Sequence, residues 1–156
     1  MNYYRLEYDF EKILGKIPEE TKQQYKSSGA IIYLINKEHL NRVDRDEYQG
    51  IKLSMSEYLQ FGVGGIVAYS ATVKYARDLG FLVLSDDKIC VRADNVQAYI
   101  KAYFCEGDSV DRSETHRIPF EEHGFNVDAV TAGSDSDPEA LETLRKEARK
   151  LGREVL

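Results

Sequence analysis

The stretch EYLQFGVGGIVAYSATVKYARDLGFLVL, residues 57–84, decides the fold that we predict. Residues 58–73 within it carry no charge, whereas 31% of the whole chain is charged, so the folded protein is expected to bury this segment. Glycines crowd the positions just after Phe61, and glycine suits a tight turn that needs a positive φ. The pattern therefore predicts a helix that ends at Phe61, a glycine turn, and a second helix over 66–79.

The predicted helix over 66–79 has one apolar face and is followed by strand-like sequence. Its apolar residues recur every three or four positions, which is typical of a helix that buries one face. These residues are Ile66, Tyr69, Val73 and Ala76. After Gly80, the segments FLVL, SDDK and ICVR predict a β-hairpin over 81–92, because two apolar runs flank a turn that contains aspartates.

The first part of the chain predicts further helices and one short strand. Apolar residues at helical spacing predict a helix over 2–15, and a proline-led segment predicts another over 18–28. GAIIYLINKEHLNR predicts a buried helix over 29–42, although its β-branched residues would also suit a strand. A minor strand is predicted over 51–53, followed by a helix that begins near Met55 behind a serine cap.

The composition of the chain changes after Cys105. Residues 1–105 are neutral in sum, so the net charge of −6 falls entirely on the remainder. We predict that a helix over 94–104 closes the first part, that an acidic and partly ordered linker covers 106–137, and that an amphipathic helix covers 138–156. The chain is thereby divided into a domain of residues 1–105, a linker and a terminal helix.

The order helix, loop, short strand, helix, turn, helix and hairpin resembles that of winged helix-turn-helix proteins, in particular the winged-helix regulators of bacteria, archaea and plasmids. The resemblance covers residues 30–92 and is carried by FGVGG at 61–65, the pair Thr72-Val73, and DLGFLVL at 78–84. It implies an α+β fold class, with a winged helix-turn-helix-like domain, extra N-terminal helices and a C-terminal amphipathic helix.

The resemblance implies a small DNA-binding regulator of viral or plasmid type, acting as a homodimer. Helix 66–79 would then enter the major groove, and the hairpin 81–92 would touch the DNA backbone. The residues expected to contact DNA are Ser70, Lys74, Arg77, Lys88 and Arg92. On this interpretation the protein is not an enzyme, and no catalytic residue, metal or cofactor is predicted.

The scarcity of positive charge on helix 66–79 keeps a second interpretation open. DNA bases and phosphates are read mainly by Arg, Lys, Asn and Gln, and this helix offers one lysine and one arginine. A winged helix that binds protein would explain its small and apolar residues better. The alternative is therefore an inhibitor or assembly factor that uses a tyrosine-rich surface or the helix 138–156, without DNA.

Three local motifs point to other chemistry, but each has a simpler explanation. The glycines at 62–65 do not complete a phosphate-binding G-x-G-x-x-G motif, because position 67 is valine. GSDSD at 133–137 resembles a signature of the aminoimidazole ribonucleotide carboxylase mutases, yet it is explained by a polar turn and a helix cap. Four residues could be written as a zinc set, although they lack the close ligand pairs of structural zinc sites: Cys90, Cys105, His116 and His123.

The cysteine content and the hydropathy of the chain predict its cellular compartment. Two cysteines do not make a disulfide framework, and free thiols favour a reducing, cytoplasmic compartment. The N-terminus lacks the basic start and apolar run of a signal peptide. No stretch reaches the roughly 20 apolar residues of a membrane helix, so a membrane partner is not expected.

Overall fold

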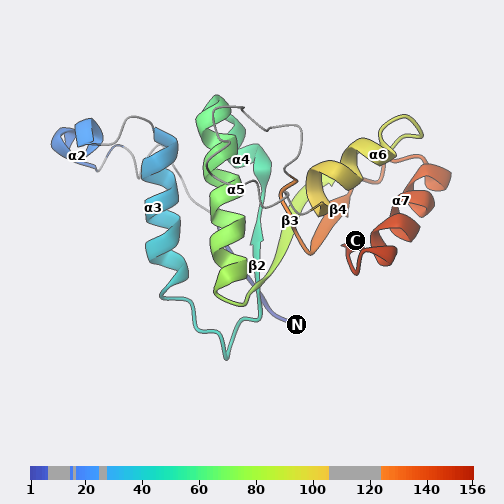
Figure 1. Cartoon of the computed structure of the whole chain (residues 1–156), viewed down its shortest axis with the longest axis horizontal. Helices are drawn as coiled ribbons and strands as arrows, with labels where there is room; N and C mark the ends of the chain where they lie inside the picture. The colour runs from blue at the N-terminus through green and yellow to red at the C-terminus, as the bar shows by residue number, and fades with distance from the viewer. Residues whose placement is uncertain (7–14, 16, 25–27, 106–123) are drawn as a thin grey trace, which may run out of the picture. The chain divides into compact units, whose positions relative to one another are not determined.

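The computed structural model describes residues 1–6, 15, 17–24, 28–105 and 124–156 (Figure 1). These residues form two compact units, Met1–Asp86 and Asp87–Leu156.

Parallel strands form the sheet of the first unit. β1 (Tyr3–Arg5) pairs with β2 (Gly50–Leu53), and β2 pairs with the first part of β3 (Leu82–Ile89). In this register Arg5 lies opposite Lys52. Because parallel neighbours need a long crossover, helices are expected between consecutive strands.

Helices occupy both crossovers of the first unit. α2 (Glu19–Gln24) and α3 (Ser28–Leu40) connect β1 to β2, and α4 (Met55–Leu59) and α5 (Gly62–Asp78) connect β2 to β3. α3 and α5 lie side by side in Figure 1. The alternation of strand and helix is that of an α/β fold with a parallel sheet.

Close approaches of α5 to α3 and to α4 explain two of the glycines. A Cβ atom added to Gly29 would lie 2.2 Å from the carbonyl oxygen of Gly64, far inside van der Waals contact. A Cβ on Gly65 would lie 1.8 Å from the carbonyl oxygen of Tyr58, at the contact between α4 and α5. These glycines therefore allow helices to pack backbone against backbone.

Hydrogen bonds between side chains link the helices in the interior of the first unit. The Asn36 amide on α3 donates to the Tyr58 hydroxyl at 2.8 Å and to the Thr72 hydroxyl at 3.0 Å. The rings of Tyr58 and Tyr69 meet edge to face with centroids 5.4 Å apart. Tyr69 on α5 in turn hydrogen-bonds Ser85 on β3, so the helical layer is tied to the sheet.

The second unit continues the alternation. It contains α6 (Val96–Tyr99), the π-helical turn η1 (Ile100–Phe104), β4 (Ala129–Ala132), α7 (Pro138–Lys150) and β5 (Glu154–Val155). β4 and β5 pair in parallel, with α7 as their crossover. The Asp137 carboxylate caps α7 by accepting from the Ala140 amide at 2.9 Å, and Pro138 takes the first helical position.

The winged-helix prediction is wrong, because residues 81–92 do not form a hairpin. β3 runs without a turn from Leu82 to Ile89 and pairs in parallel with β2. The SDDK segment that suggested a turn lies inside this strand. The fold class is therefore a parallel-sheet α/β fold rather than an α+β winged helix-turn-helix domain.

The glycine turn and the first helix were also predicted wrongly. α5 begins at Gly62, so the predicted turn is its first helical turn, and only Gly62 among the glycines of this segment has a positive φ, at +64°. Residues 3–5 are strand rather than helix, because they find a partner in β2. Residues 7–14, on which the rest of that predicted helix falls, lie outside the described residues.

Other predicted elements are confirmed. Helices occupy most of 29–42 and 94–104, a strand covers 51–53, and a helix begins at Met55. The predicted terminal helix begins at Pro138 but ends at Lys150, because the chain then turns at Gly152 and adds β5 to the sheet. The division into a domain, a linker and a terminal helix stays a prediction.

Candidate active site

Near the carboxyl ends of β2 and β3, buried side chains alternate with charged ones along each strand. Residues at alternate positions of a strand point to opposite faces. Ile51 and Val83 are fully buried, and Ser85 contacts Tyr69, so this face lies against the helices. Lys52 and Asp86 alternate with these residues and therefore lie on the other face.

A lysine–aspartate ion pair lies where β2 and β3 end their pairing. The Lys52 Nζ atom is 3.3 Å from the Asp86 Oδ2 atom, and the side chains are 31% and 15% exposed. The last residue of β2 pairs with Ser85, so Asp86 stands one position beyond the paired segment. The carboxyl ends of parallel strands are where α/β proteins bind ligands, so this pair marks a candidate active site.

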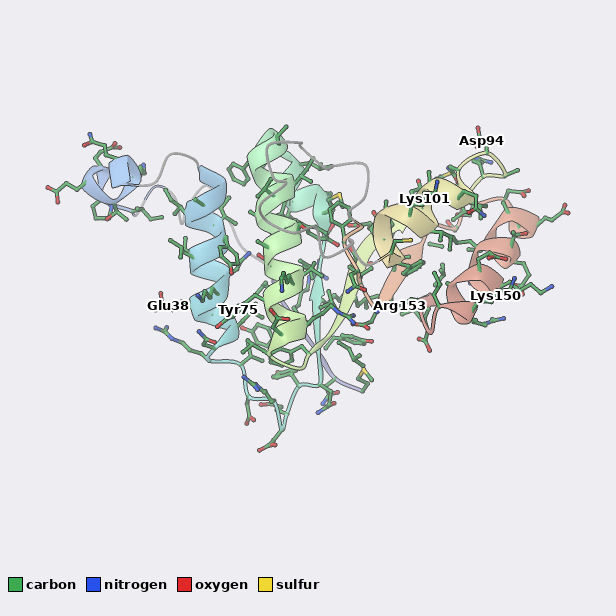
Figure 2. The ribbon with its side chains drawn as sticks, in the orientation of Figure 1. Glu38, Tyr75, Asp94, Lys101, Lys150 and Arg153 are labelled. Atoms are coloured by element: carbon green, nitrogen blue, oxygen red, sulfur yellow. The ribbon has the colours of Figure 1, made fainter. Side chains whose placement is uncertain are left out.

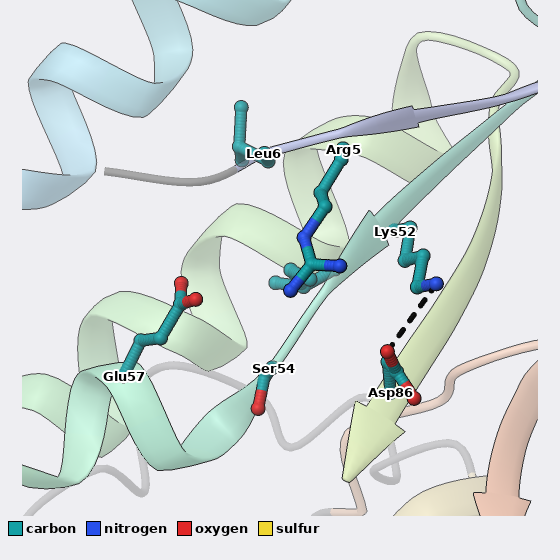
Figure 3. A pocket seen from close by; sticks show the side chains of 7 residues that line it. Arg5, Leu6, Lys52, Ser54, Glu57 and Asp86 are labelled. Atoms are coloured by element: carbon teal, nitrogen blue, oxygen red, sulfur yellow. Dashed lines mark ion pairs between the residues drawn. The ribbon is translucent and has the colours of Figure 1, made fainter. Parts of the chain in front are cut away.

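A small pocket surrounds the ion pair (Figure 3). Its volume is about 10 Å³, close to the minimum that holds one water molecule. Its lining includes two cations and two carboxylates. The lining residues are Arg5, Leu6, Lys52, Leu53, Ser54, Glu57 and Asp86.

The strand that carries Asp86 is fixed from the helix side. Ser85 is fully buried and hydrogen-bonded to the Tyr69 hydroxyl. Tyr69 is itself fully buried against Tyr58. Because Ser85 precedes Asp86 directly, this contact limits the movement of the backbone that presents the carboxylate.

The residues predicted to contact DNA fall in two different units. Ser70, Lys74 and Arg77 lie on α5 in the first unit, where exposed Lys74 pairs with Asp78 at 3.1 Å. Lys88 and Arg92 lie in the second unit, where the Lys88 amide donates to the Thr131 hydroxyl at 2.9 Å and the Arg92 amide donates to the Asn95 side chain.

The predicted tyrosine-rich contact surface is not supported either. Tyr58 and Tyr69 are fully buried, and the Tyr103 hydroxyl donates to Asp87 inside the second unit. In the first unit, Tyr75, which is labelled in Figure 2, donates to Asn41 at 2.6 Å. The Lys37 Nζ atom lies over the ring of Tyr75. Many tyrosines are thus used for internal packing and hydrogen bonding.

The described parts of the chain contain no group of three or more His, Cys, Asp and Glu residues that could hold a metal ion. Of the zinc set considered above, His116 and His123 fall outside them. Within the same described ranges, no helix is long and apolar enough to cross a membrane.

Comparison with solved structures identifies the fold class. The chain is similar to OMP decarboxylase from Leishmania donovani, with a TM-score of 0.57, 20% identity, and coverage of 85% of this chain and 43% of that one. UMP synthase from the same organism matches with a TM-score of 0.55 and 20% identity, covering 85% of this chain and 24% of that chain. At this identity the matches show a shared α/β fold.

The curated relatives are also named as decarboxylases. Orotidine 5'-phosphate decarboxylase from Clostridium perfringens is 32% identical over 95 residues, which cover 61% of this chain and 32% of the relative. The protein of that name from Petrotoga mobilis is 30% identical over 95 residues with the same coverage. The chain therefore spans about a third of the length of the curated relatives it matches. No protein-family model matches the chain.

These relatives overturn the predicted function. They are named as enzymes that act on a small molecule, and none is named as a DNA-binding regulator or a protein-binding winged helix. The prediction that the protein is not an enzyme and the prediction of a DNA partner are both corrected by this finding. The predicted homodimer stays untested.

Sequence analysis missed Lys52 and Asp86. A lysine between two apolar residues, and aspartates directly after the apolar run 81–84, were the available signal. Aspartates are also common in turns, and a turn was predicted at this position instead. The two residues become a site only through the parallel pairing of β2 with β3.

Proposed function

We propose that this chain acts in the decarboxylation of orotidine 5'-phosphate, with Lys52 and Asp86 in the active site. The observation that carries the proposal is the Lys52–Asp86 ion pair at the carboxyl ends of adjacent parallel strands. The names of the curated relatives support the choice of reaction and substrate. In β/α barrel enzymes, catalytic residues come from the ends of several different strands at this same edge.

The chemistry of decarboxylation gives the lysine a role. The bond between the ring carbon and the carboxylate carbon breaks, CO₂ leaves, and the electron pair stays on the ring carbon. That carbon must then gain a proton, which the Lys52 ammonium group can donate as a general acid. The resulting amine regains its proton from water, so atoms and charge balance over the cycle.

Asp86 would act indirectly, through its ion pair with Lys52. A carboxylate at 3.3 Å restricts the orientation of the long, flexible lysine side chain. The side chains are partly shielded from solvent, so the attraction between them is screened less than at a surface. Asp86 would thus hold the proton donor in place.

The proposed function is tested with the full chain and orotidine 5'-phosphate labelled at the carboxylate carbon. Release of labelled CO₂ above the rate in buffer is expected, and Asp86→Asn should reduce it strongly. Asp78→Asn is the matched control, because Asp78 is an exposed aspartate that pairs with Lys74 on α5. The proposal fails if the chain releases no CO₂ above buffer, or if both variants release it at the same rate.

The proposed location is the cytosol. Cys90 and Cys105 are both free thiols, as is common in a reducing compartment.

A further inference from the structure

We propose that Asn36 is a positioning residue for the Lys52–Asp86 pair, although it lies on α3 and belongs to neither strand that carries the pair. It acts through the buried side chains of Tyr58 and Tyr69, which lead from α3 to the strand that presents Asp86. The expected effect on turnover rests on the proposed function. The expected effect on the ion pair is a property of the fold and is tested separately.

The buried polar side chains of the first unit are joined to one another. Among the residues that the structure describes, the buried side chains that are polar without being aromatic are Asn36, Thr72 and Ser85. Hydrogen bonds and one ring contact join them to the equally buried side chains of Tyr58 and Tyr69. Because a polar group in a core is costly unless it is hydrogen-bonded, such contacts are expected to fix the side chains that make them. We call these five side chains the Asn36 network.

Asn36 holds two helices at the α3 end of the network. Its amide nitrogen donates to the Tyr58 hydroxyl at 2.8 Å and to the Thr72 hydroxyl at 3.0 Å. The Thr72 hydroxyl in turn donates to the carbonyl oxygen of Ala68, one turn earlier in α5, at 2.7 Å. A single side chain of α3 is thus bonded to one residue of α4 and one residue of α5.

The rings of Tyr58 and Tyr69 carry this constraint from the helices towards the sheet. They meet edge to face, with centroids 5.4 Å apart and an angle of 76° between their planes. Aromatic pairs have preferred geometries, so a Tyr58 ring that is held by Asn36 also limits the orientation of the Tyr69 ring. The Tyr69 hydroxyl hydrogen-bonds Ser85 on β3, which completes the connection.

The far end of the network reaches the ion pair through the backbone of β3. Ser85 faces the helices, and the next residue, Asp86, points to the opposite face, where its carboxylate pairs with Lys52 at 3.3 Å (Figure 3). A shift of the Ser85 backbone therefore moves Asp86 with it. Because the lysine side chain is long and flexible, its ammonium group stays in one place only while the carboxylate does. Loss of Asn36 should thus loosen the ion pair without removing either charge.

Chemical labelling of Lys52 tests the inference without turnover. The full chain is treated with an amine-reactive succinimidyl ester, and the labelling rate of each lysine is measured by mass spectrometry of its peptides. In Asn36→Leu, Lys52 should be labelled about 5-fold faster relative to Lys74, the change expected when about one hydrogen bond no longer holds the pair. Lys74 is the internal reference, because it is exposed and pairs with Asp78 on its own helix.

Two further variants separate the network from a general loss of packing. Tyr58→Phe keeps the ring and removes the hydroxyl that accepts from Asn36, so Lys52 should again be labelled faster. Leu40→Val is the matched control, because Leu40 is a buried apolar residue of α3, one turn after Asn36. It should leave the labelling of Lys52 unchanged. Unchanged labelling in both network variants overturns the inference, and so does an equal increase in Leu40→Val.

Turnover gives the second measurement. Asn36→Leu should lower kcat for CO₂ release by about 10-fold and change KM for orotidine 5'-phosphate by less than about 2-fold, because a displaced proton donor affects the chemical step more than substrate binding. Asn36→Leu combined with Tyr69→Phe should be no slower than the slower single variant, since both changes act through Ser85. Losses that multiply, or a change confined to KM, overturn the inference.

The two measurements separate this inference from the proposed function. Faster labelling of Lys52 in both network variants of a chain that releases no CO₂ would support the inference for the ion pair and overturn the proposed function. Release of CO₂ with unchanged labelling and unchanged kcat in these variants would support the function and overturn the inference. Faster labelling with unchanged kcat also overturns the inference, because the loosened pair would then have no effect on the proton donor.

Discussion

The two faces of the first unit's strands differ in charge near the ends of β2 and β3. On one face, Ile51 and Val83 have no exposed surface and pack under the helical layer. On the other, Lys52 and Asp86 alternate with them along the same strands and form a partly exposed ion pair. Because side chains alternate between the two faces of a strand, buried core residues and residues of the proposed site are neighbours in the sequence. Substitutions on one face should change folding, and those on the other should change activity.

The largest expected effect is loss of the proton donor on the charged face. Lys52→Met keeps much of the aliphatic side chain but removes the ammonium group, so kcat for CO₂ release should fall by at least about 100-fold. The free energy of unfolding should change little by comparison. Lys74→Met, at an exposed position of α5, is the matched control and should keep full activity. Normal turnover by the Lys52→Met variant would show that Lys52 is not the proton donor.

On the buried face, a cavity should cost stability. Val83→Ala removes two methyl groups from a site with no exposed surface, and we expect a loss of about 2–3 kcal/mol in the free energy of unfolding. The same change at Val67, which is 51% exposed, should cost less than about 0.5 kcal/mol. Urea unfolding followed by circular dichroism measures both. Equal losses would mean that Val83 does not belong to the core.

A smaller effect is expected where the buried face touches the charged one. Tyr69→Phe removes the hydroxyl that bonds Ser85, next to Asp86, and should cost about 1 kcal/mol of stability. Because the Asp86 backbone is then held less firmly, kcat should fall more than KM changes. Tyr75→Phe is the control, since its hydroxyl bonds Asn41 at an exposed position. If the two variants behave alike, the Tyr69–Ser85 contact does not position the carboxylate.

The smallest effect concerns the ionisation of His39. Partial burial, and then the positive charge of Arg42, lower the pKa of His39 below its ordinary value. The unfolded chain therefore binds the proton more readily, so stability should rise with pH up to about 6.5 and fall as the pH drops through the lowered pKa. In His39→Gln this part of the pH dependence should disappear from unfolding curves. An unchanged dependence would assign it to other groups.

The difference between the faces also explains what the sequence could predict. The helix over 29–42 and the start of the helix after Asp137 were predicted correctly, because their signals are local in the sequence. β1 was missed, because three residues become a strand only through pairing with β2, which lies far along the chain. The site was missed for the same reason: Lys52 and Asp86 meet through parallel register, and no local pattern encodes it.

The glycines at 62–65 show how one residue type can mislead. Their clustering predicted a turn, because glycine is permissive in backbone conformation. In the structure Gly64 and Gly65 are helical, and the missing Cβ of Gly65 allows α5 to approach α4 closely. Both explanations depend on the missing Cβ atom, and only the tertiary contact tells them apart. The winged-helix interpretation rested on the first of them.

A double-mutant cycle on Lys52 and Asp86 tests the central claim most directly. Turnover of orotidine 5'-phosphate is measured for Lys52→Met, for Asp86→Asn and for the double variant. If the pair acts as one unit, the double variant should be no slower than Lys52→Met alone, because Asp86 acts through the lysine. Losses that multiply in the double variant would contradict a shared role, and so would single variants with unchanged turnover.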